Sequence, residues 1–73
     1  MSDERLTARE AAKLLTLLNA ANIVNASMVL LTTTSPVAIA ATLGGGNKRM
    51  RRLVAELIDA ARDDDSYLDF SAK

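Results

Sequence analysis

The stretch LGGGNKRMRR, residues 43–52, holds the two features that decide the fold: three successive glycines and the basic start of a helix. Inside a helix each glycine costs roughly 1 kcal/mol relative to alanine. We therefore expect Gly44 to Gly46 to form a joint between two helices, with Asn47 as the cap of the second. The second helix then begins with cations, at the end where the helix dipole disfavours positive charge.

The segment after this joint is the clearest amphipathic helix in the chain. Its apolar side chains form one stripe at helical spacing, made of Met50, Leu53, Val54, Leu57, Ile58 and Ala61. Its ends carry a basic cluster of Lys48, Arg49, Arg51 and Arg52 and an acidic end of Asp63, Asp64 and Asp65. If the same helix of a second copy lies antiparallel to it, the basic cluster of each chain meets the acidic end of the other. We therefore expect a homo-oligomer, a two-fold dimer in preference, whose affinity comes from the apolar stripe.

The segment TAREAAKLL, which begins at Thr7, has the pattern of a helix start. Thr7 and Glu10 fit a capping box. Apolar residues then recur at spacings of three and four, at Ala11, Leu14, Leu18, Ala21 and Met28, with Asn25 in the place of one member. Because neither glycine nor proline interrupts this run, we prefer one long helix from about residue 7 to about residue 31. A break near Asn19 to Asn22 is the alternative.

Three asparagines, Asn19, Asn22 and Asn25, lie three residues apart on this otherwise apolar run. One interpretation is a polar position on a helical seam, because a single buried asparagine fixes register and oligomer number. The other is that some of these side chains face water or cap a break in the helix.

A short middle helix is expected after Ser35 and Pro36, since serine caps helices and proline suits the first helical position. The sequence thus predicts an all-α fold: a small bundle of a long N-terminal helix, a short middle helix and an amphipathic C-terminal helix. We expect one helical domain over residues 1–73. A short tail at residues 66–73 carries Tyr67 and Phe70.

Composition narrows the range of functions. Nine basic and nine acidic residues cancel, and the chain has neither cysteine nor histidine. Most enzyme chemistry and the usual zinc sites need those two residue types, and the acidic end lacks the ligand spacing of an EF-hand loop. We therefore expect no catalysis, no cofactor and no metal. The mixed charges of the first ten residues differ from a signal peptide and predict a cytoplasmic protein.

The segment LTAREAAKLL, residues 6–15, resembles the opening helix of excisionase-type and MerR-type helix-turn-helix domains. The resemblance covers ten residues. The residues that follow, TLLNAANIVNASMVLL, supply neither a glycine turn nor a charged recognition helix. The resemblance therefore implies a helix start and no family.

Together these features favour a small interaction or regulatory module that binds itself or a partner protein through an apolar helical seam. The alternative is nucleic-acid or phosphate binding through residues 44–52, where a glycine-rich joint leads into a basic helix start. The spacing there matches neither a Walker P-loop nor the dinucleotide fingerprint. A second alternative is a small membrane-associated protein, because residues 14–47 carry no charge, but asparagine and threonine dilute that segment and disfavour insertion.

Overall fold

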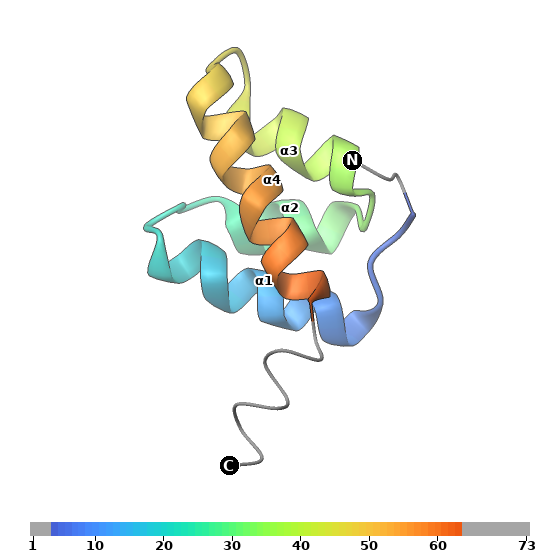
Figure 1. The fold of residues 1–73 in the computed structure, drawn as a ribbon. Helices are drawn as coiled ribbons and strands as arrows, with labels where there is room; N and C mark the ends of the chain where they lie inside the picture. The colour runs from blue at the N-terminus through green and yellow to red at the C-terminus, as the bar shows by residue number, and fades with distance from the viewer. Residues whose placement is uncertain (1–3, 64–73) are drawn as a thin grey trace.

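The computed structural model describes residues 4–63, and this part of the chain folds into four helices without a strand (Figure 1). They are α1 (Ala8–Ala20), α2 (Ala26–Thr32), α3 (Pro36–Gly44) and α4 (Lys48–Arg62). The predicted all-α bundle is confirmed. Asp64, Asp65 and the tail at residues 66–73 lie outside the described residues.

The start of α1 has the predicted capping box. Thr7 Oγ1 accepts a hydrogen bond from the Glu10 backbone N–H at 3.1 Å, and the Thr7 N–H donates to Glu10 Oε1 at 2.9 Å. The two bonds satisfy amides that a helix start otherwise leaves without partners. Before the cap, the Leu6 N–H donates to the Thr34 carbonyl at 2.9 Å, which joins the N-terminal segment to the loop between α2 and α3.

The expected single helix over residues 7–31 is wrong, because α1 ends at Ala20 and α2 begins at Ala26. Asn22 has a φ of 64°, a left-handed conformation that asparagine tolerates better than other side chains. The Ile23 N–H donates to the Leu18 carbonyl, and the Asn22 N–H to the Asn19 carbonyl, both at 3.0 Å. This pair of bonds is a Schellman motif, which ends α1. The predicted alternative, a break near Asn19 to Asn22, is confirmed.

The break changes which residues reach the core. The predicted apolar spacing holds at Leu14 and Leu18, which are fully buried, and fails beyond them. Ala21 and Met28 are exposed, whereas Ile23, Ala26 and Val29 are buried. A left-handed residue redirects the backbone, so the helical repeat of α1 cannot continue into α2.

In the bundle α4 packs against both α3 and α1, and α2 connects α1 to α3 (Figure 1). The buried apolar residues are Leu6, Leu14, Leu18, Ile23, Ala26, Val29, Ile39, Ala40, Val54, Ile58 and Ala61. Among the described residues no polar or charged residue is buried. At the C-terminal end of α4, Arg62 Nη2 donates to the Glu4 carbonyl and closes the bundle onto its N-terminal segment. Over residues 4–63 no helix combines the length and apolarity that crossing a membrane requires.

Candidate functional site

The beginning of α3 is fixed by the residues that the sequence indicates. Ser35 Oγ accepts a hydrogen bond from the Ala38 N–H at 3.3 Å, and Pro36 occupies the first turn. Thr33 Oγ1 accepts from the Ser35 N–H at 3.0 Å, which orders the loop just before the cap. Ile39 and Ala40 bury the inner face of α3, so its C-terminal end is held at a defined place beside α4.

The glycines form the expected joint, and two of them have a definite structural requirement. Gly44 is the last residue of α3, and a Cβ placed on it would lie 2.7 Å from both the backbone nitrogen and the Cα of Arg51. Gly45 has a φ of 56°, the left-handed region that favours glycine, and its N–H donates to the Ala41 carbonyl at 2.9 Å. Only residues 45–47 then separate α3 from α4.

Asn47 caps α4 as predicted. Its Oδ1 accepts a hydrogen bond from the Met50 N–H at 3.1 Å, and its own N–H donates to the Gly44 carbonyl at 3.0 Å. The first bond stabilises the start of α4 and the second closes the turn. Asn47 therefore fixes the position at which the basic residues begin.

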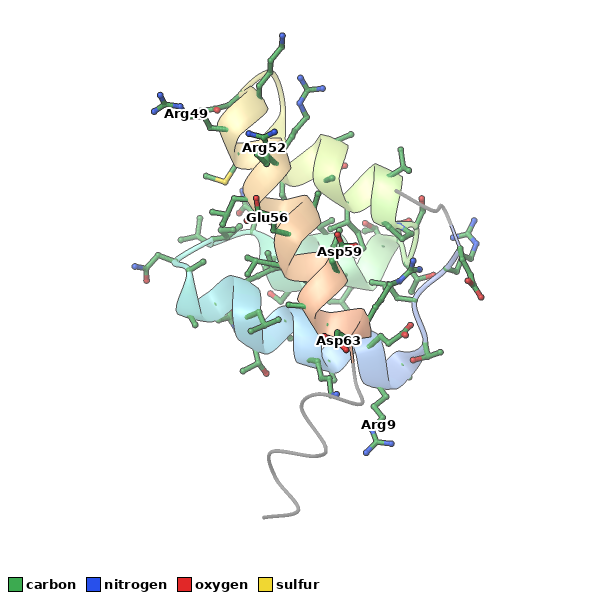
Figure 2. All side chains as sticks on the ribbon, viewed as in Figure 1. Arg9, Arg49, Arg52, Glu56, Asp59 and Asp63 are labelled. Atoms are coloured by element: carbon green, nitrogen blue, oxygen red, sulfur yellow. The ribbon has the colours of Figure 1, made fainter. Side chains whose placement is uncertain are left out.

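The basic cluster, Lys48, Arg49, Arg51 and Arg52, lies in the first two turns of α4, and all four residues are exposed. Figure 2 shows Arg49 pointing outward from the end of the helix and Arg52 on its outer face. The described part of the chain gives none of the four an ion pair or a side-chain hydrogen bond. Lys48, Arg49 and Arg52 line a surface hollow of about 350 Å³. The four cations are therefore available to an external anion.

Charge is sorted along α4. Glu56, Asp59 and Asp63 follow the basic cluster down the helix, and all three are exposed (Figure 2). Glu56 stands one turn after Arg52, and Asp59 lies about 10 Å along the axis from Arg52. Apart from Arg62 in the last turn, which bonds to the Glu4 carbonyl, the positive charge of α4 thus lies at its N-terminal end.

The apolar stripe of α4 lies mainly inside the chain's own core. Val54 and Ile58 are fully buried and Ala61 is nearly so, whereas Met50 and Leu57 are half-buried. Leu53 stands at the rim, with 38% of its surface exposed. The predicted antiparallel pairing of two α4 helices stays a prediction, and the buried residues of the stripe are not available to it while the bundle is folded.

The three asparagines are exposed around the joint between α1 and α2. Asn19 is in the last turn of α1, Asn22 has the left-handed conformation, and Asn25 is the residue before α2 and makes no side-chain capping bond. None of them lies in the core of the chain, so any polar seam that they form would have to lie between molecules.

The acidic end is described only at Asp63, the exposed C-cap of α4. Asp63 lies about 22 Å along the axis from Lys48, so α4 keeps Asp63 and the start of the basic cluster far apart within one chain. Over residues 4–63 there is no group of three or more acidic residues that could hold a metal ion.

Sequence reasoning missed an exposed apolar group around α2. Val24 and Leu31 are each 88% exposed and Met28 is 68% exposed. The signal that would have found them is Asn22, because a left-handed asparagine after α1 shifts the helical register of every residue that follows.

No family model matches the chain, and comparisons with curated proteins and with solved structures find no significant match. The residues of this chain are therefore the guide to its function.

Proposed function

We propose that this chain binds double-stranded DNA through α3, the turn at residues 45–47 and the basic start of α4. The observation that carries the proposal is a three-residue, glycine-containing turn that leads into a helix with four exposed cations at its N-terminal end. We assign α3 and α4 to a helix-turn-helix, a motif that joins two helices by a short turn often containing glycine. The second helix of that motif presents its N-terminal residues to base edges in the major groove.

The rigidity of the pair supports this assignment. Gly44 lets the end of α3 approach the backbone at Arg51, and Val54 and Ile58 anchor α4 in the core. The basic side chains therefore project from an element whose position is set by packing. A binding site on a packed helix holds its geometry better than one on a loop.

The distribution of charge supports an end-on approach of α4 to DNA. The chain as a whole has a net charge of zero, so attraction to a polyanion must be local. Glu56 and Asp59 are repelled by phosphates, which keeps the C-terminal half of α4 away from the duplex. The basic cluster is then the part of α4 that faces DNA.

The roles of the four cations follow from their spacing. Arg49, which points outward from the end of α4, and Arg52, on its outer face, are three residues apart (Figure 2). We assign both to the groove, where arginine reads guanine with two hydrogen bonds. Arg51 passes beside Gly44 at the junction with α3. We assign Arg51 and Lys48 to the phosphates at the groove edge.

The proposal is tested by fluorescence anisotropy with a mixed-sequence duplex of about 20 base pairs, or two helical turns. We expect the logarithm of the binding constant to fall linearly with the logarithm of the salt concentration between about 50 and 200 mM. Arg49→Gln with Arg52→Gln should weaken binding about tenfold or more. Lys48→Gln removes a cation that we assign to a phosphate. It should therefore reduce the magnitude of the slope of this logarithmic plot by about 1.

The matched control is Arg5→Gln with Arg9→Gln, which removes two exposed arginines outside the basic cluster. Arg9 lies on α1 at the other end of the molecule from Arg49 (Figure 2). Equal reductions in affinity for the two double variants would contradict the proposal. Equal binding of duplex, single strands and inorganic polyphosphate would instead support phosphate binding alone, which is the broader prediction from the sequence.

Self-association or binding of a partner protein is a second candidate function, favoured by the exposed apolar residues around α2. A cytoplasmic location, a regulatory role and the absence of catalysis and cofactors stay predictions from the sequence.

A further inference from the structure

Three large aliphatic side chains point away from the core around α2. Val24 lies in the turn before the helix and lines the same groove as Met28, and Met28 and Leu31 are three residues apart within the helix. Their exposed fractions are 88%, 68% and 88%. We call these three residues the α2 face. Contiguous exposed apolar residues of this kind mark interaction surfaces.

Grooves lie at both ends of the α2 face. Val24 and Met28 line one groove of about 450 Å³ together with Leu43 and Met50, at the corner where α3 meets α4. Leu31 lines a second hollow of about 230 Å³, which is formed almost entirely by apolar atoms. Hollows thus border the α2 face on the side of Val24 and Met28 and on the side of Leu31, and each can receive an apolar side chain from a partner.

We propose that the α2 face binds the α2 face of a second copy of this chain, about a two-fold axis near Met28. Charge selects this partner. Residues 14–47, which contain the whole of α2 and α3, carry no ionisable side chain. Residues near a two-fold axis meet their own equivalents, so a charge close to the axis would meet a like charge. A neutral face avoids that repulsion, whereas a charged partner would bury its charge without compensation.

The size of the chain favours the same partner. A domain of about 60 to 70 residues buries a modest share of its surface, and self-association is a common way to add to it. The dimer inference does not rest on DNA binding, but the two fit together. Met50 lines the groove beside the α2 face and stands between Arg49 and Arg51 on α4. A partner on this face therefore lies next to the basic cluster, and the dimer would present two α4 starts to a duplex.

Light scattering of the full chain without DNA tests the inference. We expect a mass of twice 7.8 kDa. Met28→Glu places two like charges near the axis and should raise the dimer dissociation constant about tenfold or more. The matched control is Thr16→Glu, which adds the same charge to an exposed position on α1 and should leave the mass unchanged. Circular dichroism should show the same helix content in both variants, because both side chains are exposed.

Cross-linking gives a second readout that does not depend on the glutamate variants. The chain has no cysteine, so Met28→Cys introduces a single thiol, which forms a disulfide between copies only if their Cα atoms come within about 7 Å. We expect a cross-linked dimer from Met28→Cys and none from Thr16→Cys. A monomeric wild type, a Met28→Glu variant as dimeric as the Thr16→Glu control, or no cross-link at residue 28 would each overturn the proposal. The duplex titration above remains interpretable in all three cases.

Discussion

Gly44 and Arg51 are in such close backbone contact that a methyl group on Gly44 would lie 2.7 Å from both the backbone nitrogen and the Cα of Arg51. This approach joins the end of α3 to the second turn of α4. The contact thereby sets how closely the start of α4, from which the basic cluster projects, lies against α3.

Gly44→Ala should therefore lower stability by about 1 to 3 kcal/mol, because the added Cβ meets backbone atoms that cannot move independently of α4. We also expect weaker DNA binding, since α4 must shift to make room. Thermal unfolding followed by circular dichroism measures the first effect and duplex anisotropy the second. Gly46→Ala is the control, because nothing lies within 4 Å of a Cβ there. Equal melting temperatures for the two variants would show that the contact is not a constraint.

The left-handed residue between α1 and α2 gives a second prediction. Asn22→Gly should preserve or raise stability, because glycine adopts a φ of 64° without steric cost. Asn22→Ala should lower it by about 1 kcal/mol, since alanine is strained in that conformation. The difference between the two unfolding midpoints is the measurement. An alanine variant as stable as the glycine variant would indicate that residues 21–25 continue the helix, as the preferred interpretation of the sequence expected.

The contrast between the two joints explains how far the sequence could predict this fold. Gly44 to Gly46, Ser35 with Pro36, and Thr7 with Glu10 are local signals, because each acts within a few residues, and all three are confirmed. The Asn22 joint depends on packing, because alanine, leucine and asparagine are compatible with continued helix. Its left-handed conformation is favoured once Ile23 and Leu18 are both buried across the Schellman motif.

The candidate site likewise combines features that follow from local sequence with features that depend on packing. The basic cluster and its cap at Asn47 were predictable from residues 47–52 alone. The close approach of α3 to α4 was not, since the backbone contact of Gly44 with Arg51 is seen only in the folded structure. The α2 face was missed because the preferred continuous helix placed Met28 on the apolar run, whereas its exposure follows from the register change after Asn22.

Two substitutions of Asn47 distinguish effects on the stability of α4 from effects on DNA affinity. Asn47→Ala should cost about 1 kcal/mol of stability, because it removes the bond to the Met50 N–H. Asn47→Asp should keep that bond and complement the helix dipole, so its melting temperature should equal or exceed that of the wild type. The new carboxylate would nevertheless stand beside the basic cluster and reduce duplex affinity. An aspartate variant with undiminished DNA binding would place the duplex away from the start of α4.

Removal of a negative charge from the C-terminal half of α4 should strengthen duplex binding. Glu56→Gln removes a negative charge one turn from Arg52 and should increase duplex affinity several-fold at low salt. The gain should shrink as salt is raised, because screening weakens the repulsion between Glu56 and phosphate. Anisotropy titrations at two salt concentrations measure both effects. A gain that persists unchanged at high salt would point to a cause other than charge.

Reversal of the charge at Arg49 and Arg51 distinguishes the two arrangements of the dimer. The sequence alone predicts antiparallel α4 helices, in which Arg49→Glu with Arg51→Glu weakens self-association and Asp63→Lys with Asp64→Lys restores it. The fold buries Val54, Ile58 and Ala61 within one chain, so we expect instead that the mass in solution is unchanged while duplex binding is abolished. Light scattering and anisotropy on the same samples decide the question. A fall to the monomer mass that the two lysine substitutions reverse would establish the antiparallel pairing. A dimer mass that is unchanged while duplex binding is lost would contradict it. That result would assign the basic cluster to DNA and the dimer contact to the α2 face.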